Sequence, residues 1–103
     1  MENTFVMKEH DDTLKIIRKE YQEQITHWLN HDLVNGQKNY NAFIEQNLMN
    51  NLTILQMRSL LRRINIYNEC PLTIIGLNPS DPYLAVSQND MYIGIEPDGY
   101  IHS

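Results

Sequence analysis

Residues 70–82 read CPLTIIGLNPSDP, and this stretch divides the chain into a helical part before it and a β-rich part after it. Pro71 has no backbone N–H and cannot continue a helix, and it restricts Cys70 to extended geometry. The run Leu72–Leu77 is rich in β-branched side chains, which favour a strand. Asn78–Pro82 combines Asn, Ser, Asp and two prolines, a composition typical of a turn. The sequence therefore predicts helices before Pro71 and a sheet after it.

The last third of the chain is predicted to form an antiparallel meander of three to four strands, within about residues 72–102. Turn-forming residues stand at Gln88–Asp90 and Pro97–Gly99. The expected strands after Leu72–Leu77 are, in order, Tyr83–Ser87, Met91–Glu96 and a short return at Tyr100-Ile101.

Alternation within one strand indicates which face is buried. In Met91–Glu96 the apolar residues at odd positions alternate with Tyr92, Gly94 and Glu96, the period of a strand with one buried face. We expect the helices on the apolar face. The opposite face would then show Tyr92, and either Tyr83 or Leu84, to solvent or to a partner.

Three helices are predicted before Pro71, over about residues 12–34, 38–49 and 53–67. In the first, apolar side chains at three- and four-residue spacings form one stripe. Its members are Leu14, Ile17, Tyr21, Ile25, Trp28 and Leu29. The second has Tyr40, Phe43, Ile44 and Leu48 on one side, and the third has Ile54, Met57, Leu60, Leu61, Ile64 and Tyr67.

The ends of the first helix are predicted from capping residues. Asp11 or Asp12 is the expected N-cap, and Gly36 is the expected C-terminal stop. Two structures fit residues 1–10, namely a short strand at Phe5–Met7 or an earlier start of the helix.

Asn50-Asn51 is expected to break the second helix, because Asn is a poor helix former that prefers caps and turns. Thr53 and Gln56 then match a capping box, in which hydroxyl and amide bind each other's backbone N–H groups. A continuous helix over residues 38–67 is the main alternative.

The order of helices then strands predicts an α+β fold, with the helices packed on one face of the sheet. A length of 103 residues is that of a single domain. The lone cysteine, Cys70, forms no disulfide within the chain and suits a reducing compartment. With no signal-peptide pattern and no apolar run of spanning length, we expect a cytoplasmic protein.

The net charge of −5 is unevenly distributed. Residues 34–69 have four basic and two acidic side chains, whereas residues 70–103 have four acidic side chains and no Lys or Arg. A tail without positive charge repels phosphate backbones and suits a basic partner surface. Tyr is enriched in binding hot spots, and clustered acids steer basic partners. The residues predicted to bind a protein partner are Asp90, Tyr92, Glu96, Asp98 and Tyr100.

Two other candidate sites are alternatives to this predicted protein-binding surface. Arg58 and Arg62, one helical turn apart and followed by Arg63, could bind a phosphate or carboxylate, as in a nucleic-acid or nucleotide binder. Ion pairs with acids of the first helix are the preferred explanation of these arginines. His27 and His31, four residues apart near Glu20 and Glu23, have a spacing that can hold a divalent metal. Such residues are also common on the solvated flank of an amphipathic helix.

No motif in the sequence names a reaction or a cofactor. Serine-nucleophile, phosphate-loop and dinucleotide patterns are absent, and Cys70 would face the negative end of the preceding helix, which disfavours a thiolate. We therefore expect a non-enzymatic, small acidic protein-binding module that needs no cofactor. Inhibitors, immunity proteins and phage-type regulators are of this kind. Self-association through the Trp28 helix or the last strand is also open.

Overall fold

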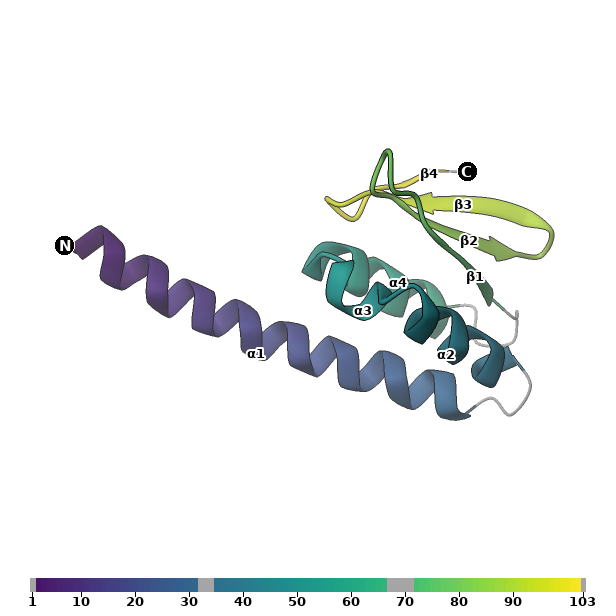
Figure 1. The fold of residues 1–103 in the computed structure, drawn as a ribbon, viewed down its shortest axis with the longest axis horizontal. Coiled ribbons are helices and arrows are strands. Elements are labelled where there is room, and N and C mark those ends of the chain that lie inside the picture. The colour runs from purple at the N-terminus through teal and green to yellow at the C-terminus, as the bar shows by residue number, and fades with distance from the viewer. Residues whose placement is uncertain (1, 32–34, 67–71, 103) are drawn as a thin grey trace.

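A computed structural model describes residues 2–31, 35–66 and 72–102 and has the α+β order that the sequence predicts (Figure 1). The helices are α1 (Glu2–His31), α2 (Asn35–Glu45), α3 (Leu48–Asn51) and α4 (Ile54–Ile66). The strands are β1 (Leu72–Leu77), β2 (Leu84–Gln88), β3 (Met91–Ile95) and β4 (Ile101–His102).

The four strands form one antiparallel sheet in the order β1-β2-β3-β4, which confirms the meander. Val86 pairs with Ile74 on one side and Ile93 on the other. These residues are buried, because alternate side chains of each strand face the helices. The β2–β3 turn is formed by Asn89 and Asp90, both with positive φ (53° and 62°), as a two-residue hairpin turn requires.

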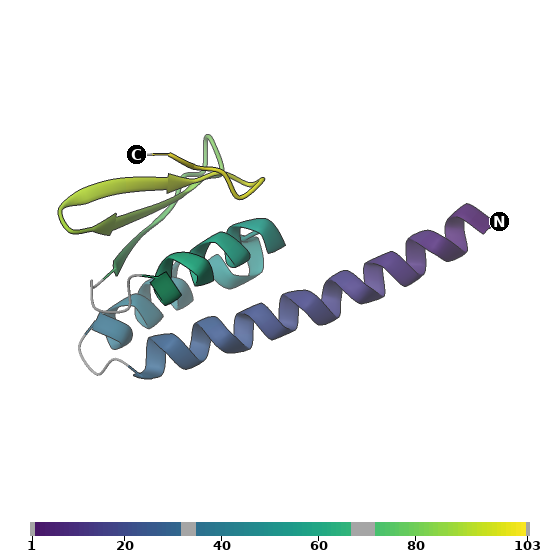
Figure 2. The ribbon, with the colours of Figure 1, turned by 180° about the vertical axis from the view of Figure 1, so that it is seen from behind.

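The helices all lie on one side of the sheet, in two layers (Figures 1 and 2). α2 packs against β1 and α4 against β3, and α1 crosses α2 and α4 on the side away from the sheet. The core lies between these layers. Its fully buried members are Ile25, Leu29, Phe43, Leu48, Leu52, Met57, Leu60, Leu72, Leu84, Val86 and Ile95.

The predicted capping box at the start of α4 is confirmed. The Gln56 N–H donates to Thr53 Oγ1 at 3.1 Å, and the Thr53 N–H donates to Gln56 Oε1 at 2.9 Å. Met57, Leu60, Leu61 and Ile64 are buried as expected, while Tyr67, Cys70 and Pro71 lie outside the described residues.

The first helix begins earlier than its expected N-cap. α1 starts at Glu2, so Asp11 and Asp12 lie within it as exposed residues and the strand at Phe5–Met7 is wrong. An Asp on the solvent side costs an α-helix only a few tenths of a kcal/mol, about 0.7 at most. It therefore does not stop a helix that continues on both sides.

The expected helix breaks are also displaced. Gly36, the expected stop, lies in the first turn of α2, and Asn50-Asn51 lies within α3. The 38–49 segment breaks instead at Asn47, which takes the left-handed conformation (φ 53°) that Asn tolerates better than most residues. The chain breaks again at Leu52, which is extended, so a continuous helix over 38–67 is wrong.

Strand ends differ from the prediction by one residue. β2 begins at Leu84 rather than Tyr83, and β4 at Ile101 rather than Tyr100. Leu84 is fully buried and faces the helices, so of the two alternatives Tyr83 is the residue on the outer face. No helix within the described part of the chain has the length and apolar character needed to cross a bilayer.

Candidate interaction surface on the sheet

The face of the sheet that points away from the helices carries two of the most exposed large side chains in the described structure. Tyr92 on β3 is 74% exposed, and Tyr100, just before β4, is 65% exposed. The alternation of β3 places Tyr92, Gly94 and Glu96 on this side, since Ile93 and Ile95 are buried against the helices. This surface has no helix over it (Figure 1).

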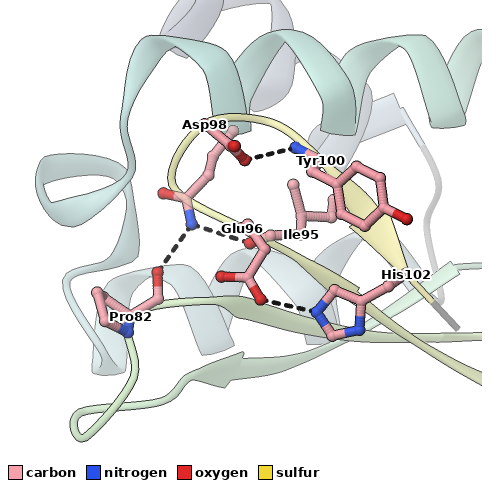
Figure 3. Close-up of polar contacts among 7 residues, drawn as sticks. Pro82, Ile95, Glu96, Asp98, Tyr100 and His102 are labelled. Carbon is pink, nitrogen blue, oxygen red and sulfur yellow. Dashed lines mark hydrogen bonds and ion pairs between the residues drawn. The ribbon is translucent and has the colours of Figure 1, made fainter.

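One end of this face holds a cluster around His102 (Figure 3). His102 Nε2 lies 2.8 Å from Glu96 Oε1. The Tyr100 ring is stacked on the imidazole, with centroids 6.2 Å apart and planes 23° apart. The ring of Tyr83, the residue just before β2, approaches the imidazole with centroids 6.1 Å apart and planes 58° apart. A carboxylate and two aromatic rings therefore fix the orientation of His102.

The β3–β4 hairpin brings these residues together. Its register places His102 opposite Gly94, where a Cβ atom would lie 3.0 Å from His102 Cε1 and 3.3 Å from Tyr83 Cδ2. The hairpin is closed by the Glu96 N–H, which donates to the Tyr100 carbonyl at 2.8 Å. Gly94 thus leaves the space that the imidazole ring occupies.

The loop of this hairpin is hydrogen-bonded to α4 and to Thr53, the residue just before that helix. Thr53 Oγ1 donates to the Pro97 carbonyl, and Ser59 Oγ donates to the Gly99 carbonyl at 2.6 Å. Gly99 has a φ of 87°, a conformation that glycine adopts without strain. The Asp98 carboxylate accepts the Tyr100 N–H at 3.0 Å (Figure 3). The rigid helix therefore positions the loop that carries Tyr100.

The structure separates the five residues predicted to bind a partner. Tyr92, Glu96 and Tyr100 share the outer face, and Asp90 is exposed in the turn at the opposite end of β3. Asp98 accepts the Tyr100 N–H and lines a hollow beside α4. The sequence prediction omitted His102, because its place opposite Gly94 depends on the hairpin register.

Two of the three arginines of α4 are not paired as expected. Arg58 and Arg62 are exposed and line a hollow of about 280 Å³ together with Asp98. Neither forms an ion pair with the acids of α1 whose side chains the structure describes, which are Asp11, Asp12, Glu20 and Glu23. Arg63 Nε donates to Gln88 Oε1 at 3.0 Å, which joins α4 to β2. The negative charge of Asp98 in this lining opposes the binding of an anion by Arg58 and Arg62.

His27 and His31 are exposed on α1, with their rings stacked at a centroid distance of 5.8 Å. They border a groove together with Glu20 and Glu23. Among the residues that the structure describes, no group of three or more His, Cys, Asp or Glu side chains is placed to hold a metal ion.

Compared with protein-family models, curated proteins and solved structures, the chain matches none of them. The fold defines a small α+β protein with one face of its sheet not covered by a helix.

Proposed function

We propose that this protein is a protein-binding module that contacts a basic partner through the outer face of its sheet. The observation that carries the proposal is the uncovered acidic and aromatic face formed by Tyr92, Glu96, Tyr100 and His102. Asp90 adds an exposed carboxylate in the β2–β3 turn, at the far end of β3 from this cluster. Such a module acts by occupying a surface of its partner, as inhibitors, immunity proteins and phage-type regulators do.

The chemistry of the face favours a protein over a polyanion. Exposed tyrosines supply large contact area at low cost in side-chain entropy, which is why Tyr is common in hot spots. Residues 70–103 contain no Lys or Arg, so no side chain of this segment offers a permanent positive charge to a phosphate. Glu96 instead offers a carboxylate to a partner's Lys or Arg.

The face is also partly preorganised. The contacts of His102 with Glu96, Tyr83 and Tyr100 hold its ring before any partner arrives. Ordering side chains on binding costs about 0.5–1.5 kcal/mol each, so a ring that is already held loses less. This favours a specific contact over loose electrostatic attraction.

The test is affinity capture from cells of the natural source, followed by measurement of the affinity of the purified partner for the wild-type chain and its variants. We expect a stoichiometric protein that binds the wild-type chain and loses about 30-fold in affinity with the double variant Tyr92→Ala/Tyr100→Ala. That loss corresponds to one hot spot of about 2 kcal/mol. Glu96→Gln should reduce the salt dependence of binding.

The matched control is Ile16→Ala/Ile44→Ala, which removes two side chains of similar exposure (61% and 60%) from the helices. This control should bind the partner as the wild type does. Equal loss in both double variants, or no loss in either, would place the contact elsewhere. Bound nucleic acid that dissociates with Arg58→Ala would support the arginine helix instead.

A further inference from the structure

A groove of about 480 Å³ lies between α1 and α4, on the helical side of the molecule. Its apolar part is formed by Trp28 of α1, which is half-buried, and by Leu61 and Ile64 of α4, which are buried members of the core. An apolar strip between two packed helices, with a tryptophan along it, has the form of a groove that accepts another helix.

The rim of the groove is polar, and its charged groups are acidic, with two histidines and the neutral Gln24 beside them. Glu20, Glu23, His27 and His31 are all exposed and line it along α1. Among the described lining residues there is no Lys or Arg. From Glu20 to His31 the helix rises about 16 Å at 1.5 Å per residue, which matches about three turns of a second helix.

We propose that this groove binds a basic amphipathic helix of a partner protein. The apolar stripe of that helix would pack on Trp28, Leu61 and Ile64, and its Lys or Arg residues would face Glu20 and Glu23. The complementarity of charge at the rim selects a basic helix over an acidic one. This site differs from the proposed sheet surface, because the layer of α2 and α4 lies between the sheet and α1 (Figure 2).

The experiment uses the fluorescence of Trp28, the one tryptophan of the chain. The probes are three synthetic peptides titrated into the full-length protein. One is an amphipathic Leu/Lys helix, the second has the same composition scrambled so that no apolar stripe forms, and the third is the amphipathic Leu/Glu counterpart. We expect only the first to change the emission saturably with a stoichiometry of one to one.

A charge variant and its control locate the contact. Glu20→Gln/Glu23→Gln should weaken binding of the Leu/Lys helix by about fivefold, the sum of two exposed charge contacts. Asp12→Asn/Glu45→Gln makes the same change of charge at exposed acids that do not line the groove, and should leave affinity within about twofold.

Three outcomes overturn the proposal. Equal response to the scrambled peptide would mean attraction of any polycation, and equal response to the Leu/Glu helix would mean simple apolar adsorption. No change in Trp28 emission with any of the three peptides would mean that the groove does not receive a helix.

Discussion

At the scale of single residues, Gln56 ties the helices to the sheet. Its side chain is 1% exposed, and its Nε2 donates to the carbonyls of Pro82 and Ile95, both at 3.0 Å. Its Oε1 accepts the Thr53 N–H at the start of α4. The Gln56 side chain thus supplies hydrogen bonds to a backbone N–H at the start of α4, to a carbonyl in the loop before β2 and to a carbonyl at the end of β3.

Gln56→Leu is therefore expected to destabilise the fold strongly. The change keeps the volume roughly constant but leaves the buried Ile95 carbonyl, the partly buried Pro82 carbonyl and the Thr53 N–H without their partner, at a cost of about 2–4 kcal/mol. Chemical denaturation followed by circular dichroism measures this loss. Gln37→Leu is the control, because Gln37 is exposed and its hydrogen bond among the described residues is to Asn41 in the same helix. A loss as small as the control's would mean that water satisfies these groups in the variant.

The sequence predicted half of the Gln56 contacts. The spacing from Thr53 to Gln56 is a local signal, and the capping box followed from it. The bonds to Pro82 and Ile95 join residues 26 and 39 positions away, which no local pattern encodes. His102 was missed for the same reason, since its neighbours depend on the register of two strands.

At the scale of elements, α2 closes one edge of the sheet. Asn39 Nδ2 donates to the Leu72 carbonyl at 2.7 Å, and its Oδ1 accepts the Ile74 N–H at 3.0 Å. Gln46, just after α2, makes the same pair of bonds with the Ile75 carbonyl and the Leu77 N–H. Each carboxamide thus replaces a peptide group of a missing neighbouring strand, which protects the β1 edge from pairing with another chain.

Replacing Asn39 is expected to open that edge. Asn39→Leu removes two buried hydrogen bonds and should cost about 2–3 kcal/mol of unfolding free energy. The exposed β1 edge should also make the protein associate as its concentration rises.

Sedimentation measurements over a range of concentration test the second effect. Asn41→Leu serves as the control on the same helix, because Asn41 is exposed and its described hydrogen bond is to Gln37 alone. A destabilised Asn39→Leu variant that stays monomeric would mean that Gln46 alone protects the edge.

The element boundaries show which features local sequence patterns determine and which depend on packing. Strands were predicted to within a residue, because proline, asparagine and aspartate mark their turns. The helix breaks were displaced because Asn47, Asn50 and Asn51 have the same intrinsic tendency to interrupt a helix. Only packing decides which of them turns. Here Leu48, the first residue of α3, and Leu52, the residue after it, are both fully buried.

At the scale of the whole molecule, α1 is longer than the body on which it packs. The molecule measures 51 Å along its longest axis and 28 Å and 26 Å across, and the first turns of α1 extend beyond the other elements (Figures 1 and 2). Within residues 10–31 of α1, the first fully buried residue is Ile25, and Tyr21 packs partly against the core.

Removal of residues 1–8 is therefore expected to leave the fold intact. Helical turns that extend beyond the other elements add little stability, so the unfolding free energy should change by less than about 0.5 kcal/mol. Thermal unfolding and the helical signal of the shortened chain measure this directly. A loss above about 2 kcal/mol, or a fall in molecular mass, would show that these turns pack against something, in the second case another copy.

The two proposed surfaces should also act independently. The sheet face and the α1–α4 groove belong to different layers, and mutations with no shared contacts are usually additive to about 0.3–0.5 kcal/mol. Tyr92→Ala/Tyr100→Ala should therefore bind the Leu/Lys peptide with an affinity within about twofold of wild type. Glu20→Gln/Glu23→Gln should likewise leave the captured partner's affinity unchanged. If either double variant weakens binding at the other surface by tenfold, one ligand contacts both surfaces, or α4, which lines the groove and holds the hairpin loop through Ser59, couples them.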